Sequence, residues 1–154
     1  MDILTWRLVR QWACLGAALL LLGACTGFAP HRGDVGATCS LAADDQADRQ
    51  ACKQAAIESS PSFDLAVVEL TDQGWLQSRD QLTHALALMD PRAADPSPVQ
   101  VVLFVHGWQH SGAYDDANLR MFRGLVLPQF ARSGQKRGLR TVGIYVGWRG
   151  ESLA

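Results

Sequence analysis

Residues 101–112 read VVLFVHGWQHSG, five apolar side chains that run directly into a His-Gly pair. With the two residues before it, this run predicts a strand over residues 99–105 that is buried on both faces, as in a parallel sheet covered by helices. Such a strand presents His106, Gly107 and Trp108 at its carboxyl end. Binding sites in open α/β sheets form beyond that end, so this loop is the first candidate for a functional site.

The sequence before this strand predicts another strand and a helix. FDLAVVEL at 63–70 is rich in strand-forming residues and ends in TDQG at 71–74, which is typical of a turn. Ser78 and Gln81 form an S-x-x-Q capping box at the start of the predicted helix. The apolar residues at helical spacing are Leu82, Leu86 and Met89.

The sequence after the His-Gly pair repeats this order of elements. Asp115 and Asp116 are expected to cap a helix in which Pro128 introduces a kink. Its predicted apolar stripe comprises Leu119, Phe122, Leu125, Val126 and Phe130. LRTVGIYV at 139–146 predicts a further strand. The alternation of strand and helix indicates an α/β fold, with a parallel sheet of about three strands and flanking helices, over residues 61–154.

The strands and the loop between them resemble those of the α/β-hydrolase superfamily. VVLFVHGW is similar to the family's third strand and its His-Gly loop, and LRTVGIYVGWRG to its fourth strand. DLAVVELTDQGWL resembles the entry strand of a bacterial subgroup of exported hydrolases with HGW in this loop. The resemblance covers roughly residues 63–154 and implies only part of an α/β-hydrolase sheet.

The resemblance assigns roles within the loop. It implies that the backbone N–H of Trp108 donates to the oxyanion hole, while Gly107 permits a tight backbone path. It also implies that His106 organises the loop, since the family's catalytic histidine comes much later. A role for His106 as the catalytic base is the weaker alternative. Trp108 and Trp148 are expected either to line an apolar acyl pocket or simply to pack at the sheet edge.

Other polar pairs near the loop have more ordinary interpretations. His106 and His110 are four residues apart, but the glycines around them favour a loop and no third ligand is evident, so no metal site is expected. Asp115 and Asp116 have the residue type of paired acid–base carboxylates, although helix capping is the favoured role. No cofactor is expected.

Near its end the sequence contains GESLA at 150–154, which fits G-x-S-x-A and is close to a nucleophile elbow. Only one helix and one strand separate HGW from Ser152, whereas the family places its nucleophile after a further helix and strand. Ser152 is therefore interpreted as a decoy. Because the family order is Ser, then acid, then His, we expect this chain to be an inactive N-terminal portion of a serine hydrolase that needs the missing residues.

Residues 1–24 have the features of a lipoprotein signal peptide. Arg7 and Arg10 precede an apolar run of about a dozen residues, which is too short to cross a bilayer. The run ends in LGAC, which resembles the bacterial lipobox and implies cleavage before Cys25 and acylation of that cysteine. An ordinary cleaved signal and a short uncleaved anchor remain alternatives. Residues 25–60 are expected to form a tether and a small helical appendage.

Two cysteines, Cys39 and Cys52, remain in the exported part. An even pair in an oxidising compartment favours a disulfide over two free thiols. A straight helix would separate the two residues by about 20 Å, and a disulfide needs Cα atoms within about 7 Å. The bridge therefore requires a turn between them.

Composition limits the function classes. Of 154 residues, 48% are hydrophobic and the net charge is −1, so the chain has no basic excess that would attract nucleic acid. We expect a lipid-anchored esterase or lipase portion in the bacterial cell envelope, at the outer membrane or the periplasmic face, whose full-length parent acts on an ester or lipid. The alternatives are a non-catalytic lipoprotein that binds a partner or lipid, and a small enzyme that uses Ser152.

Overall fold

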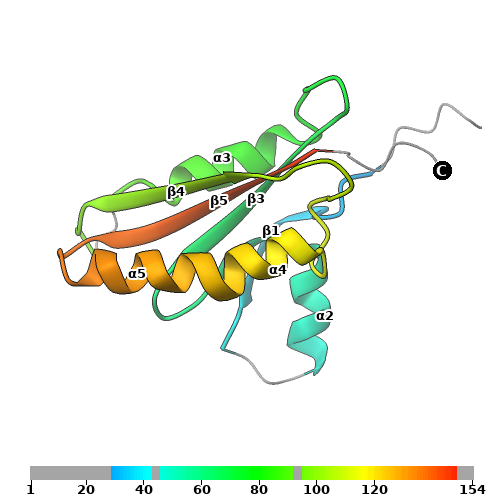
Figure 1. The fold of residues 1–154 in the computed structure, drawn as a ribbon. Coiled ribbons are helices and arrows are strands. Elements are labelled where there is room, and N and C mark those ends of the chain that lie inside the picture. The colour runs from blue at the N-terminus through cyan, green and yellow to red at the C-terminus, as the bar shows by residue number, and fades with distance from the viewer. Residues whose placement is uncertain (1–28, 43–45, 92–94, 149–154) are drawn as a thin grey trace, which may run out of the picture.

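The computed structural model describes residues 29–42, 46–91 and 95–148, which form a five-stranded sheet with helices on both faces (Figure 1). The strand order is β1-β2-β3-β5-β4. The strands are β1 (Asp34–Ser40), β2 (Ala55–Ser59), β3 (Asp64–Leu70), β4 (Val99–Val105) and β5 (Arg140–Trp148). The helices are α2 (Gln46–Gln54), α3 (Arg79–Ala87), α4 (Ala117–Met121) and α5 (Leu127–Gln135), with the π-helical segment η1 (Phe122–Val126) between the last two.

The strands predicted around 63–70, 99–105 and 139–146 are present as β3, β4 and β5. All three are parallel, and β5 lies between the other two. The whole sheet is mixed rather than parallel, because β2 runs antiparallel to β3 while β1 runs parallel to β2. The turn expected at 71–74 is also present, closed by a hydrogen bond from Gly74 N–H to the carbonyl of Thr71.

The segment expected to be a tether and helical appendage contributes two strands to the sheet. Residues 34–40 form β1, and residues 55–59 form β2 directly after α2. Nor is the stretch before β1 a free tether, because Arg32 is completely buried. The predicted disulfide joins Cys39 of β1 to Cys52 of α2, with Cα atoms 4.9 Å apart. The lipobox and Cys25 lie outside the described residues.

Alternating side chains of β3 build two apolar cores, one on each face of the sheet. Leu65 and Val67 face the long helix formed by α4, η1 and α5, whereas Ala66 and Val68 face the side of α3. Figure 1 shows the two helical layers on opposite faces of the sheet. The other members of the first core are Phe63, Leu119, Phe122, Leu127, Ala131 and Tyr145, and those of the second are Ile57, Ala85, Val142 and Ile144.

The predicted stripe of the long helix is correct in part. Leu119 and Phe122 are buried and Val126 packs, partly buried, against the same core, but Leu125 and Phe130 are exposed. Leu127, which was not predicted, is also fully buried, consistent with the wider spacing of the π-helical turn before it. Pro128 follows this turn as the second residue of α5, a position near a helix start at which proline is tolerated.

The capping box predicted for α3 does not form. Ser78 is the N-cap residue but makes no side-chain cap hydrogen bond, and Gln81 is buried with its amide turned towards β3. The face of α3 that packs on the sheet carries Gln81 and Ala85, and the predicted Leu82 and Leu86 are exposed. The packed face of α3 is thus offset by one residue from the face that the apolar spacing predicts. The hydrogen bond between buried Gln81 and the backbone of Glu69 sets this orientation.

β4 lies at the edge of the described sheet, and the prediction that both its faces are buried is wrong there. Val101, Leu103 and Val105 are exposed, Leu103 to 62%. Val102 and Phe104 point the other way and pack against the core under the long helix. Within the described residues, the apolar strand thus has one covered face and one open face.

Candidate functional site

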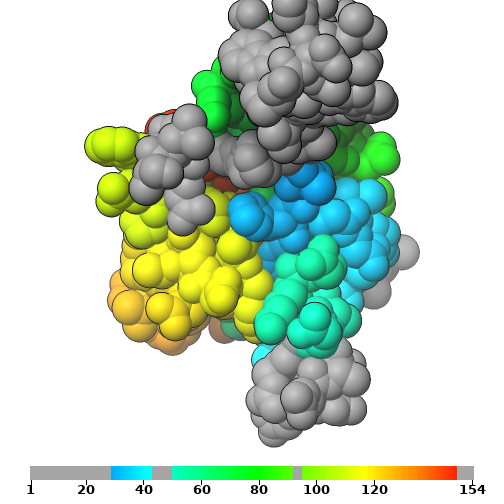
Figure 2. Space-filling model, turned by 90° about the vertical axis from the view of Figure 1, so that its right-hand side faces the viewer, coloured from blue at the N-terminus to red at the C-terminus, as the bar shows by residue number. Residues whose placement is uncertain are grey.

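The carboxyl ends of β3, β4 and β5 meet at one edge of the sheet, which Figure 2 shows facing the viewer. The HGW loop follows β4 at this edge. Trp108 lies in a turn and is 66% exposed. Within the described part of the chain, its backbone N–H makes no hydrogen bond. This unbonded donor, in an exposed turn at a strand end, is the feature on which any chemistry at the loop depends.

His106 fixes the loop to the end of β5. Its side chain is buried, and its Nε2 accepts a hydrogen bond from the backbone N–H of Trp148 at 2.8 Å. Because Nε2 is an acceptor, the ring proton of neutral His106 is on Nδ1, which donates to the carbonyl of Gly107 at 2.6 Å. The acceptor nitrogen is therefore occupied, which leaves no free basic site for the role of catalytic base.

Trp148 holds the same histidine from a second direction. Its indole N–H donates to the carbonyl of His106 at 2.8 Å, and the two rings stack with centroids 5.7 Å apart. The cavity that Trp148 lines has a volume of only about 10 Å³, which is roughly the volume that one water molecule needs. In the described structure, Trp148 is thus a packing residue of the loop. The acyl pocket considered for Trp108 and Trp148 is not formed by this pair.

The strained backbone of the loop is at Gln109 rather than at Gly107. Gln109 has a φ of 63°, in the left-handed region, whereas Gly107 does not have a positive φ. A residue with a side chain is uncommon there and costs of the order of 1 kcal/mol or more. The neighbouring contacts of His106 and Asp116 must therefore hold this turn in place.

Asp116 secures the far end of the loop, while Asp115 is exposed. The Asp116 carboxylate caps α4 by accepting from the N–H groups of Asn118 and Leu119, at 2.8 and 3.2 Å. It also accepts from the N–H of Ser111 at 3.1 Å and lies 3.2 Å from Nδ1 of His110. Burial alone raises the pKa of Asp116, but these hydrogen bonds outweigh it and hold the pKa below its ordinary value.

Two glycines allow the loop to lie directly on the sheet. A Cβ at Gly147 of β5 would lie 2.9 Å from the backbone nitrogen of Gly112, and a Cβ at Gly112 would lie 2.8 Å from the carboxylate of Glu69. Both contacts are closer than a real side chain tolerates. The close packing places the loop against Glu69, which is the penultimate residue of β3.

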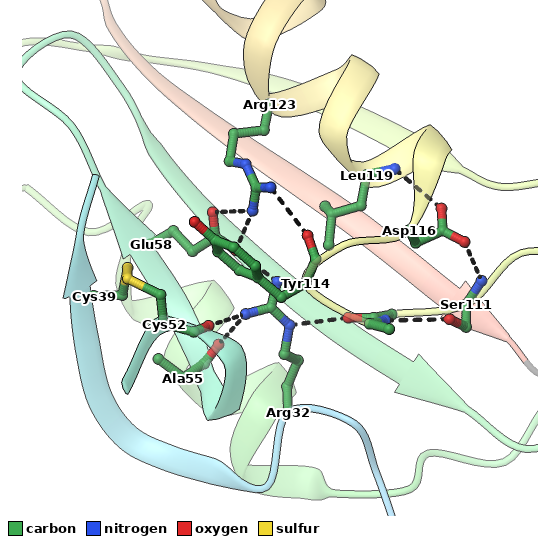
Figure 3. A network of polar contacts seen from close by, with 12 residues as sticks. Arg32, Cys39, Cys52, Ala55, Glu58, Ser111, Tyr114, Asp116, Leu119 and Arg123 are labelled. Atoms are coloured by element: carbon green, nitrogen blue, oxygen red, sulfur yellow. Dashed lines mark hydrogen bonds and ion pairs between the residues drawn. A yellow bond between two sulfur atoms is a disulfide. The ribbon is translucent and has the colours of Figure 1, made fainter. Parts of the chain in front are cut away.

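A buried cluster of charges lies beneath the loop and was not predicted from the sequence (Figure 3). Its centre is Arg32, whose guanidinium donates to the carbonyl of Gly112 at 2.9 Å and pairs with the Glu58 carboxylate at 2.6 Å. Further donations reach the carbonyls of Cys52 and Ala55. Burial lowers the pKa of Arg32, and the charge of Glu58 opposes that effect.

Two more charged residues complete this cluster. Arg123 of η1 binds both oxygens of Glu58, at 3.0 and 2.9 Å. Glu69 accepts from the backbone N–H groups of His31 and Arg32, at 3.0 and 2.9 Å. Two arginines thus balance two carboxylates. The sequence signal was Glu69 itself, a charge inside the apolar run FDLAVVEL, since a buried charge requires partners.

The remaining candidate sites are of lesser consequence. The residues in the described ranges hold no cluster of three or more His, Cys, Asp or Glu side chains suited to a metal ion. A polar cavity of about 360 Å³ lies at the amino ends of the parallel strands, far from the HGW loop, and is lined in part by Ser60, Asp64 and Arg140. Ser152 lies outside the described residues. None of the helices in the described ranges is long and apolar enough to cross a bilayer.

Comparison with known proteins adds no assignment. No protein-family model matches the chain, and no curated protein or solved structure matches it either. The geometry of the carboxyl edge is therefore the basis on which a function can be proposed.

Proposed function

We propose that the chain is the N-terminal portion of a lipid-anchored serine hydrolase of the α/β-hydrolase type, with esterase or lipase activity in the full-length parent. The observation that carries the proposal is the backbone N–H of Trp108, which makes no hydrogen bond among the described residues and lies in an exposed turn just after a His-Gly pair at the end of a parallel strand. Such a donor suits the oxyanion that forms when a serine attacks an ester carbonyl.

The rigidity of the loop supports this role. An oxyanion donor is effective only when it is held in place before the reaction, since reorganisation during the reaction would cost free energy. Here His106 ties the loop to Trp148, and Arg32 ties it to β2 through Glu58. In other hydrolases the loss of one such donor costs about 2.7–4 kcal/mol, or roughly 100- to 1,000-fold in rate.

The open edge of β4 supports the proposal that further strands belong to the functional domain. Val101, Leu103 and Val105 expose one apolar face, and β4 pairs only with β5 among the described strands. Exposed apolar edges favour pairing with another strand. In the proposed parent, a strand added here carries the nucleophilic serine to the side of β4 away from β5, beside the HGW loop.

The test is to express the complete reading frame and to treat the protein with a fluorophosphonate probe. We expect a labelled serine C-terminal to Ala154 and ester hydrolysis that Trp108→Pro reduces about 100- to 1,000-fold. Proline removes the N–H, whereas the matched control Trp108→Ala keeps it and should change the rate only a few-fold. Equal rates in the two variants would exclude the oxyanion role, and label on Ser152 would favour the small-enzyme alternative.

The same open face favours one alternative function, a non-catalytic lipoprotein. Exposed apolar stripes on an edge strand are also typical of surfaces that bind another protein or a lipid. A reading frame that stops at Ala154, together with absence of fluorophosphonate labelling in the folded protein, would support this alternative over the hydrolase.

A further inference from the structure

The carboxyl edge of the sheet carries exposed aromatic and apolar side chains from two loops. Trp75 and Leu76 lie in the loop after β3, and Trp75 is 73% exposed. Trp108 lies in the loop after β4. We call these three residues the apolar rim. Since β3 and β4 both flank β5 and end at the same edge, the two loops belong to one face of the molecule (Figure 2).

The N-terminal segment enters the fold at this same edge. The backbone N–H groups of His31 and Arg32 are both bound by the carboxylate of Glu69, near the end of β3. Only five residues lie between Cys25 and His31 in the sequence, so six residue-to-residue steps join them. Even a fully extended chain spans at most about 20 Å over that distance. If Cys25 carries lipid, His31, which lies at the same edge as the apolar rim, is therefore held within about 20 Å of the bilayer surface.

The chemistry of the rim suits a lipid interface. Tryptophan combines a large apolar ring with one N–H donor and concentrates where a membrane meets water. The ionisable residues around the rim are mixed in sign and include Asp72, Arg79 and Asp80. No basic cluster occurs there within the described ranges, so attraction to anionic headgroups contributes little.

We propose that the apolar rim docks on the surface of the phospholipid bilayer in which Cys25 is anchored, so that the HGW loop faces the membrane. This inference rests on the proposed function, whose anchor it uses, and it deepens that function by naming the substrate class. The substrate is an ester with a long acyl chain that enters from the bilayer rather than from the aqueous phase.

The experiment uses the protein from the complete reading frame, produced in a bacterium that exports and acylates lipoproteins. The protein is then reconstituted in phosphatidylcholine vesicles with brominated acyl chains. Bromine quenches only tryptophans that enter the bilayer, and the contributions of Trp75 and Trp108 are taken as the difference from W75F and W108F. We expect at least half of this difference signal to be quenched. Replacing part of the lipid by phosphatidylglycerol should change the quenching by less than about twofold, because charge contributes little.

Matched variants test docking by activity. The double variant W75S/L76S removes two apolar side chains of the rim and leaves the proposed oxyanion donor Trp108 unchanged, and Leu125→Ser removes a similarly exposed apolar side chain from the long helix. We expect the double variant to raise the apparent KM for a vesicle-borne long-chain ester at least tenfold while hydrolysis of a soluble short-chain ester stays within about threefold. Leu125→Ser should change neither rate.

Mass spectrometry of the mature N-terminus separates the possible failures. An acylated protein whose Trp75 and Trp108 signals are not quenched would overturn docking, while fluorophosphonate labelling would leave the hydrolase proposal standing. Absence of acylation at Cys25 would overturn the inference as well, since the short link to the membrane would be lost. Absence of a labelled serine would refute the hydrolase proposal, whatever the quenching.

Discussion

Replacement of Arg32 by methionine should be the most damaging single change to the described fold. The Arg32 side chain is completely buried and donates to the carboxylate of Glu58 and to three backbone carbonyls, those of Cys52, Ala55 and Gly112. Methionine has a similar length but no charge and no donor. Arg32→Met therefore leaves a buried carboxylate with one of its two cationic partners and leaves three carbonyls without this donor.

The expected loss follows from these contacts. Removal of one partner from a buried ion pair costs about 3–5 kcal/mol. The retained pairing of Glu58 with Arg123 favours the lower end of that range, and the carbonyls that lose a donor favour the upper end. We therefore expect a loss of about 4 kcal/mol in the free energy of unfolding. In a protein of this size that loss corresponds to a fall in Tm of about 8–16 °C.

Urea denaturation followed by circular dichroism measures this loss. Arg120→Met is the matched control, since Arg120 is exposed, and it should change the free energy of unfolding by less than about 0.5 kcal/mol. Addition of Glu58→Gln gives a double-mutant cycle, in which the two effects should deviate from additivity by at least 1 kcal/mol. A loss below about 1 kcal/mol for Arg32→Met, or strict additivity, would refute the buried network.

Three other predictions test separate parts of the structure. Replacement of Cys39 and Cys52 by serine should lower the free energy of unfolding by about 3 kcal/mol, measured by urea denaturation, because the loop they close regains freedom in the unfolded chain; an unchanged midpoint would contradict this. Gly147→Ala should destabilise the protein by about 1–3 kcal/mol through overpacking, measured as a fall in Tm, since the new Cβ meets the backbone of Gly112. The lowered pKa of Asp116 means that its contribution to stability is present above its ordinary value of 3.8 and is lost as pH falls through the folded-state pKa. The stability difference between the wild type and Asp116→Asn should therefore shrink below about pH 4, and a difference that stays constant down to pH 2 would contradict this.

The features that sequence predicted correctly are set by local patterns. The apolar runs of β3, β4 and β5 and the turn at 71–74 each depend on a few neighbouring residues. The capping role of Asp116 is equally local, because its carboxylate accepts from the two N–H groups that follow it closely. The bridge between Cys39 and Cys52 was predicted from a different signal, an even pair of cysteines in a part of the chain expected to be exported.

The features that were missed depend on contacts distant in sequence. β1, with the sequence DVGATCS, has a weak strand pattern and is a strand because it pairs with β2 and is tied to α2. The register of the long helix changes at η1, and periodicity alone carries no sign of that turn. Gln81 fitted a capping motif, but its amide instead binds Glu69 and the carbonyl of Arg32. Long-range burial of polar groups thus overrode the local signals.

The candidate functional site also combines a feature set by a local sequence pattern with one set by long-range contacts, and this difference bears on the proposed function. Sequence located the HGW loop because a His-Gly pair after an apolar strand is a local pattern. It could not show that Arg32, about eighty residues from Gly112, holds the base of that loop. The arginine also fixes the point at which the N-terminal segment leaves the fold, since its own N–H is bound by Glu69. One buried residue therefore couples the position of the loop to the path towards Cys25. If the oxyanion role and the membrane docking are both correct, Arg32→Met should weaken them together, whereas W75S/L76S should impair docking alone, because it leaves the backbone N–H of Trp108 in place.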